Sequence, residues 1–89
     1  MKEVTIYTLD YCPYCKKAKK LLRDNNIPFN EIDITANEYS QTQRIAEEYN
    51  LQDEVTFPQI IFGKTRIGGC ADLEKIIGDN LLEKLLKED

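Results

Sequence analysis

The sequence predicts an α/β fold in which helices flank a four-stranded mixed sheet, with elements in the order βαβαββα. Three observations support this prediction. Apolar and polar residues alternate over residues 3–8, as in a half-buried strand. A nearly continuous apolar run over 56–62 is followed by Gly63-Lys64, which suits a two-residue hairpin turn with glycine first. From Asp72 onward, leucine and isoleucine recur at helical spacing.

The strand at residues 3–8 has Val4 and Ile6 on one face, and the first helix follows it directly. It begins near Pro13, because proline lacks the N–H group that would be unpaired in a first helical turn. Residues 24–26 end it. Its expected buried face consists of Cys15, Ala18, Leu21 and Leu22.

The middle and end of the chain supply the other elements. A second strand is predicted over 27–34, although its alternation breaks at residues 31–32. A second helix is predicted over 36–49. The return strand of the hairpin covers 65–67, and Gly78 interrupts the last helix, leaving room for a further short one. The expected apolar anchors of the second helix are Tyr39, Ile45, Ala46 and Tyr49.

Length and composition limit the classes of protein to which the chain can belong. With 89 residues, the chain has room for one domain, predicted over 1–89. The net charge of −4 argues against a nucleic-acid binder, and no apolar run approaches the roughly 18 residues of a membrane span. Three cysteines and no space for a signal peptide favour a cytoplasmic protein. The absence of histidine excludes Cys–His hydrolases, Ser–His–Asp triads and histidine-dependent zinc enzymes.

Cys12-Pro13-Tyr14-Cys15 places two thiols where a strand turns into a helix, which is typical of a thioredoxin-like redox site. Cys12 precedes the helix, so its sulfur points at unpaired N–H groups and the positive end of the helix dipole, which favour a thiolate. Cys15 lies inside the first turn and is the candidate that resolves a mixed disulfide. A zinc site would need about four ligands. Only Cys70 remains, so no metal site is expected.

Three motifs in this order resemble the dithiol glutaredoxins: Cys-Pro-Tyr-Cys at 12–15, Thr-Phe-Pro-Gln at 56–59, and Gly-Gly-Cys-Ala-Asp at 68–72. The resemblance covers the whole chain. It implies a thioredoxin fold and an enzyme that reduces protein disulfides and glutathione mixed disulfides. In that activity Cys12 and Cys15 are catalytic and form the redox-active disulfide. Glutathione is then a cosubstrate, and no tightly bound cofactor is expected.

The resemblance also implies a glutathione site. It implies a cis bond between Phe57 and Pro58; the alternative is an ordinary proline at the start of a strand. The N–H groups of Cys70 and Ala71 at a helix start suit a carboxylate, and Asp72 suits an ammonium; a γ-glutamyl end carries both groups. The alternative is a Gly-Gly turn with Asp72 as an N-cap. The implied residues are Tyr14, Phe57, Pro58, Gly69, Cys70, Ala71 and Asp72.

Several residues have more than one interpretation. Gln43 and Arg44 either pair with the glycine-end carboxylate of glutathione or face solvent. Cys70 is expected to be a small buried hydrophobe rather than a third redox participant. Many glutaredoxins have a lysine three residues before the first cysteine. Here Leu9 supplies no charge, and the carboxylate of Asp10 disfavours a nearby thiolate. The lysines expected to form a solvated face are Lys16, Lys17, Lys19 and Lys20.

The expected partners are glutathione and disulfide-bonded or glutathionylated proteins, with ribonucleotide reductase as one candidate. The chain is expected to act as a monomer, without nucleic acid or membrane. One alternative is an iron–sulfur carrier in which two chains each supply Cys12 and two glutathiones complete the cluster; Pro13, which stiffens the motif, disfavours it. The other is a thioredoxin-type protein reduced by a reductase. Tyr14 and the glycines at 68–69 argue against it.

Overall fold

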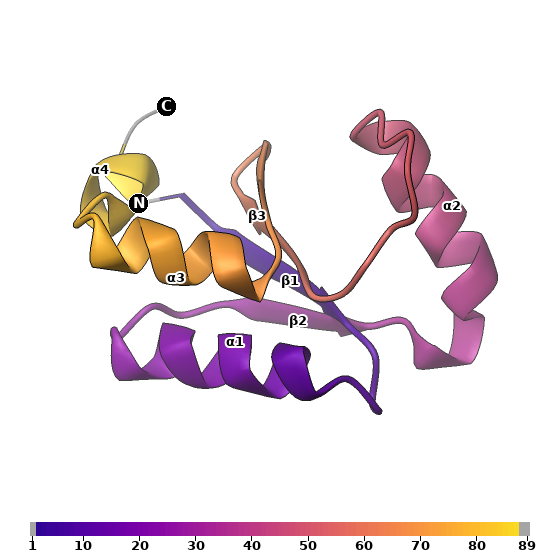
Figure 1. Ribbon diagram of the computed structural model, residues 1–89, viewed down its shortest axis with the longest axis horizontal. Helices are drawn as coiled ribbons and strands as arrows, with labels where there is room; N and C mark the ends of the chain where they lie inside the picture. Colours follow the sequence, from indigo (N-terminus) through magenta and orange to yellow (C-terminus); the bar gives the residue numbers. More distant parts are fainter. Residues whose placement is uncertain (1, 88–89) are drawn as a thin grey trace.

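The computed structural model describes residues 2–87, in which four strands form one mixed sheet (Figure 1). The strands are β1 (Val4–Thr8), β2 (Asn30–Asp33), β3 (Gln59–Phe62) and β4 (Thr65–Gly68). The helices are α1 (Pro13–Asp24), α2 (Glu38–Glu48), α3 (Cys70–Gly78) and α4 (Leu82–Lys87), and a 3-10 turn, η1 (Thr35–Asn37), precedes α2. The predicted order of elements is confirmed, including the interruption at Gly78. None of these helices is long and apolar enough to cross a membrane.

The sheet has the strand order β2-β1-β3-β4. β1 pairs with β2 in parallel and with β3 antiparallel, and β3 pairs antiparallel with β4. The β3–β4 turn contains Gly63 at a φ of 63°, in the left-handed region that glycine adopts readily. β1 is therefore a central strand, and its end leads directly into the Cys12–Cys15 segment.

Two apolar clusters hold the helices against the sheet. Because side chains alternate along a strand, Val4 and Ile6 belong to one cluster and Tyr7 to the other. The first cluster joins β1 and β3 to α1, α3 and α4, and α1 and α3 lie side by side in Figure 1. The second cluster joins the end of β1 to α2, and its buried members are Leu9, Cys12, Cys15, Ile34 and Ile45. The two cysteines of the motif are thus packed into the core.

Two expectations for the middle of the chain are wrong in detail. β2 is shorter than predicted, and Ile32 in it is 41% exposed, because β2 is an edge strand with a partner on one side only. Ile34, which follows it, is buried. Tyr39 is 77% exposed rather than an apolar anchor. It lies six residues before the buried Ile45, which places it about 120° away around an α-helix.

The start of β3 differs from the prediction. It begins at Gln59 rather than residue 56, since Pro58 has no N–H group for the ladder. α3 begins at Cys70, so the expected helix start at Cys70 and Ala71 is confirmed. Asp72 is therefore not the N-cap. It lies in the first turn, and its carboxylate accepts a hydrogen bond from the N–H of Gly69 at 2.9 Å.

The lysine face of α1 is only partly solvated. Lys19 donates to Glu31 at 2.9 Å, and the hydroxyl of Thr8 donates to the same carboxylate at 2.7 Å. The hydroxyl of Thr8 first, and Lys19 second, lower the pKa of Glu31. Lys17 pairs with Glu74 of α3 at 2.9 Å. These contacts fix the orientation of α1 relative to β1, β2 and α3, and with it the position of the cysteine motif.

Candidate active site

The sulfur of Cys12 caps the N-terminus of α1. Cys12 has extended backbone angles, and its Sγ accepts a hydrogen bond from the N–H of Cys15 at 3.2 Å. Pro13 occupies the first helical turn, where its missing N–H costs nothing. The Cys12 thiol also donates to the carbonyl of Phe57 at 3.4 Å. The predicted placement of this sulfur at the helix start is confirmed.

Cys15 lies beneath Cys12 and is 1% exposed. Burial, and second the neighbouring Cys12, raise the pKa of the Cys15 thiol to about 12. Both cysteines are free thiols in this structure. Both cysteines are buried, but Cys12, at 9% exposure, caps the helix N-terminus, whereas Cys15 is more fully enclosed.

One groove lies between the motif and α3, with a volume of about 510 Å³. It is referred to below as the α3-side groove. All seven residues that the resemblance assigned to glutathione lie along it. Its lining consists of Tyr14, Thr56, Phe57, Pro58, Gln59, Arg66, Gly69, Cys70, Ala71 and Asp72. The Phe57–Pro58 bond in its wall is cis, as the resemblance implied.

Glycine is required at the start of α3. Gly68 has a φ of 123°, which side chains rarely adopt, and a Cβ there would overlap the carboxylate of Asp72. Gly69 lies close to the carbonyl of Pro58, with 3.6 Å between that oxygen and the position of a Cβ. The positive φ therefore requires glycine at position 68, whereas a Cβ at position 69 would make an ordinary contact.

A second groove, of about 1010 Å³, lies on the other side of Cys12 against α2. It is referred to below as the α2-side groove. Gln43 lies in its wall and donates to the hydroxyl of Tyr39 at 3.0 Å, whereas Arg44 lines neither groove. Leu9 is buried and contributes apolar surface. The complete lining is Leu9, Tyr11, Cys12, Pro13, Glu38, Tyr39, Thr42, Gln43, Glu54, Val55, Thr56 and Phe57.

Residues 4–67 match the family model for glutaredoxin. The chain belongs to the glutaredoxin family. It is 37% identical to glutaredoxin 3 of Escherichia coli strain K12, over 98% of this chain and 100% of that protein. The solution structure of a Brucella melitensis glutaredoxin matches with a TM-score of 0.82 and 40% identity, covering 98% of this chain and 90% of the other. The crystal structure of a buckwheat glutaredoxin–glutathione complex shares the fold, with a TM-score of 0.79 and 22% identity over 96% of this chain and 76% of that one.

Membership of this family establishes the general activity. The chain is a thiol–disulfide oxidoreductase with a thioredoxin-like fold, and glutaredoxins as a family use glutathione as a substrate. The recognition of the family from its three motifs is thereby confirmed, as is the predicted fold class.

Sequence reasoning did not find Arg66, the one cationic residue in the lining of the α3-side groove. Its Nη1 donates to Oε1 of Gln59 at 3.2 Å, and Gln59 donates in turn to the carbonyl of Thr56 at 2.7 Å. Arg66 lies in a short exposed strand, where an arginine carries no signal. Only the hairpin register, which places it opposite Ile61, could have indicated its position.

Cys70 has the surroundings of a structural cysteine. It is buried at the start of α3, and its thiol donates to Glu74 at 3.5 Å. Burial, followed by the contact with Glu74, raises the pKa of the Cys70 thiol. These observations favour the expected role as a small buried residue, since a protonated thiol is a poor nucleophile.

The raised pKa of Cys15 predicts an alkylation profile for the variant Cys12→Ser. Burial, the largest cause of the raised pKa of Cys15, remains in this variant, so the thiolate fraction should keep growing above the ordinary pKa of a thiol. The rate at which iodoacetamide modifies Cys15, followed by peptide mapping, should therefore still be rising between about pH 9 and pH 11. A rate that levels off near pH 9 would contradict the assignment.

Proposed function

We propose that the chain is a glutathione-dependent oxidoreductase that reduces protein disulfides and glutathione mixed disulfides through Cys12 and Cys15. The observation that carries the proposal is the position of the Cys12 sulfur. It caps α1, and it lies 3.4 Å from the carbonyl of Phe57, a residue of the α3-side groove. The sulfur atom of a glutathione bound in that groove would lie next to the thiol of Cys12.

The α3-side groove suits the γ-glutamyl end of glutathione, which carries an ammonium and a carboxylate. The N–H groups of Cys70 and Ala71 at the start of α3 favour a carboxylate. Arg66 adds a guanidinium to the same groove, and Asp72 adds an acceptor for the ammonium. A buckwheat glutaredoxin of the same fold was solved as a complex with glutathione, which supports glutathione as the ligand.

Reduction of a glutathionylated protein then needs two exchanges. The Cys12 thiolate attacks the glutathione sulfur of the mixed disulfide. The Cys12–glutathione S–S bond forms as the old S–S bond breaks, and the protein leaves as a thiolate that takes a proton from water. The thiolate of a second glutathione attacks the glutathione sulfur bound to Cys12. Glutathione disulfide leaves, and Cys12 is restored as a thiolate.

Reduction of a protein disulfide uses both cysteines. Cys12 forms a mixed disulfide with the substrate, and Cys15 then loses its proton and attacks the Cys12 sulfur. The substrate leaves reduced, and a Cys12–Cys15 disulfide remains for two glutathiones to reduce. Contact with Cys12 is one cause of the raised pKa of Cys15. That contribution falls when Cys12 is bound in a neutral disulfide, so Cys15 becomes easier to deprotonate at the step that needs it.

Replacing each cysteine separately by serine tests this division of roles. Cys12→Ser should lower glutathione-coupled reductase activity by more than about 100-fold, because serine is not a comparable nucleophile. Cys15→Ser should keep the removal of glutathione from a glutathionylated protein and lose the turnover of a protein disulfide. The rate of glutathione removal and the rate of protein-disulfide reduction are each measured with glutathione and with thioredoxin reductase as electron source. Full activity of Cys12→Ser, or equal rates with both electron sources, would overturn the proposal.

Arg66→Gln tests the placement of glutathione in the α3-side groove. Loss of one charge-assisted hydrogen bond should raise the KM for glutathione about 3- to 10-fold. Lys64→Gln is the matched control, because Lys64 is a nearby exposed cation of the β3–β4 turn that lines neither groove. Thermal melting checks that loss of the bond to Gln59 leaves the fold intact. An unchanged KM in Arg66→Gln, or an equal rise in Lys64→Gln, would contradict the placement.

We also propose that residues 1–89 act as a single domain, as a monomer, in the cytoplasm. Their protein partners would be disulfide-bonded or glutathionylated proteins, with ribonucleotide reductase as a candidate. The cysteine motif and the match of residues 4–67 to the glutaredoxin family support the disulfide-bonded and glutathionylated substrates.

A further inference from the structure

Lys19 lies one helical turn after Cys15 on α1. Residues four apart lie one above the other on the same face of a helix, and helical side chains lean toward the helix N-terminus. This spacing places the side chain of Lys19 beside the turn that contains the buried Cys15 thiol. The two exchange reactions proposed above give this lysine no role.

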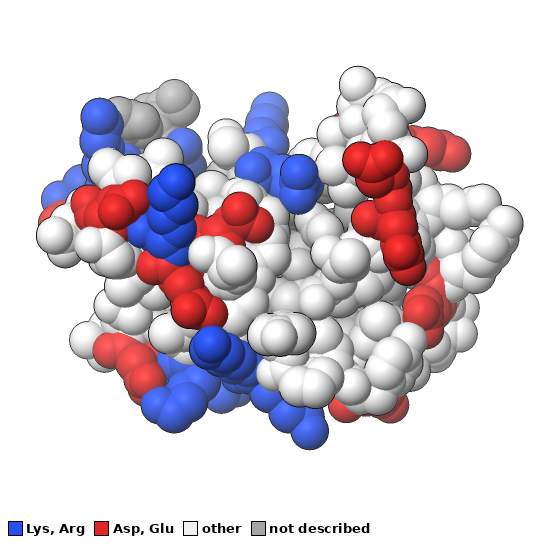
Figure 2. Space-filling view, in the orientation of Figure 1, with Lys and Arg blue, Asp and Glu red and all other residues white. Residues whose placement is uncertain are grey.

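Lys19 is more enclosed than its neighbours among the cations of α1. Figure 2 shows blue atoms along the lower edge of the molecule, over α1. The side chains of Lys17 and Lys20 are 54% and 74% exposed, whereas that of Lys19 is 19% exposed. A partly buried charge is screened less by water and salt than a surface charge, so it acts more strongly on its neighbours.

A hydrogen-bonded network holds the ammonium of Lys19 in place. Its Nζ donates to Glu31 of β2 at 2.9 Å, and the hydroxyl of Thr8 donates to the same carboxylate oxygen at 2.7 Å. Thr8 is 1% exposed and directly precedes Leu9, whose backbone hydrogen-bonds to the thiol of Cys15. The network therefore lies at the end of β1, next to the resolving thiol.

Lys19 opposes the factors that disfavour a thiolate at Cys15. Burial is the largest cause of the raised pKa of Cys15, and the contact with Cys12 adds to it. The backbone of Leu9 and the charge of Lys19 both lower that pKa. Any change that removes the charge of Lys19 should therefore make Cys15 harder to deprotonate.

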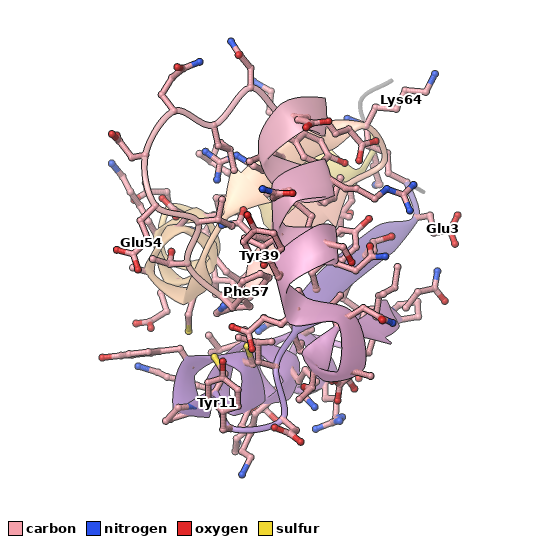
Figure 3. The ribbon with its side chains drawn as sticks, turned by 90° about the vertical axis from the view of Figure 1, so that its right-hand side faces the viewer. Glu3, Tyr11, Tyr39, Glu54, Phe57 and Lys64 are labelled. Carbon is pink, nitrogen blue, oxygen red and sulfur yellow. The ribbon has the colours of Figure 1, made fainter. Side chains whose placement is uncertain are left out.

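The other titratable groups around Cys15 in residues 2–87 are exposed, neutral or acidic. Lys16 follows Cys15 in sequence and is exposed. Figure 3 shows Tyr11 on the segment before α1, and Glu54 on the loop to one side of Phe57. The titratable members of the apolar cluster around Cys15 are Cys12, Tyr7 and Tyr49.

We propose that Lys19 is a positioning residue for the resolving step and acts through Cys15. Its ammonium, held by Glu31 and Thr8, stabilises the negative charge that develops on the Cys15 sulfur. In this step the Cys15 thiol gives its proton to water, and its sulfur bonds to Cys12 as the bond between Cys12 and the substrate breaks. The substrate leaves as a thiolate and takes a proton from water. This inference rests on the proposed function, because it concerns the step assigned there to Cys15.

Lys19→Gln tests this inference by removing the cation. Turnover of a protein disulfide at about pH 7 should fall about 3- to 10-fold, because a smaller fraction of Cys15 is thiolate. Removal of glutathione from a glutathionylated protein does not use Cys15, so its rate should stay within about twofold. Lys19→Arg keeps the charge and should restore the disulfide rate. Lys20→Gln, which removes an exposed cation of the same helix, is the matched control and should change neither rate.

The alkylation profile of Cys15 gives a readout that a purely structural role would not move. In the background of Cys12→Ser, Lys19→Gln should shift the rise in the rate of iodoacetamide modification to higher pH. Lys20→Gln in the same background should leave the profile in place. Thermal melting of each variant checks that the fold is intact.

Glu31→Gln separates the charge of Lys19 from a structural role of the ion pair. Glutamine keeps an oxygen that accepts a hydrogen bond, but it loses the negative charge that offsets Lys19. The rate of disulfide turnover should therefore be unchanged or higher. A loss as large as that in Lys19→Gln, or an equal loss of both activities in Lys19→Gln, would overturn the inference.

The unaltered chain separates the two levels of the account. If it turns over no protein disulfide, the proposed function fails. If it does so, and Lys19→Gln keeps both the disulfide rate and the alkylation profile, only the role of Lys19 fails.

Discussion

The contact on which the site depends is the hydrogen bond from the N–H of Cys15 to the sulfur of Cys12, at 3.2 Å. Every helix needs an acceptor at its N-terminus. Here that acceptor is a sulfur atom, so the interaction that begins α1 also orients the thiol toward Phe57. The same turn buries Cys15 between β1 and α2. Folding of α1 therefore gives two thiols, three residues apart, different environments and different proposed roles.

The Phe57–Pro58 loop divides the surface around Cys12 into two grooves of different character. The α3-side groove offers a guanidinium, a helix N-terminus and the carboxylate of Asp72, which together match a zwitterion. The charges of the α2-side groove are those of Glu38 and Glu54. Leu9 also lines the α2-side groove and adds no charge to it.

Residues with strong local signals were predictable, and those that depend on tertiary contacts were not. The alternation of β1, Pro13 at the start of α1 and the turn at Gly63 follow from steric and hydrogen-bonding rules that act over a few residues. The exposure of Tyr39 depends on helix phase, which the sequence sets only loosely. The bond between Tyr11 and Glu38 joins residues far apart in sequence, so no pattern could predict the acidic wall.

The central claim is that glutathione joined to Cys12 lies in the α3-side groove. It is tested most directly by trapping Cys15→Ser as its mixed disulfide with glutathione and comparing its amide NMR spectrum with that of the reduced variant. The account predicts the largest shifts at the backbone amides of Phe57 and of Gly69 to Asp72, which line that groove. Large shifts at Tyr39 and Glu54, with none at Gly69 to Asp72, would place glutathione against α2 and contradict the account.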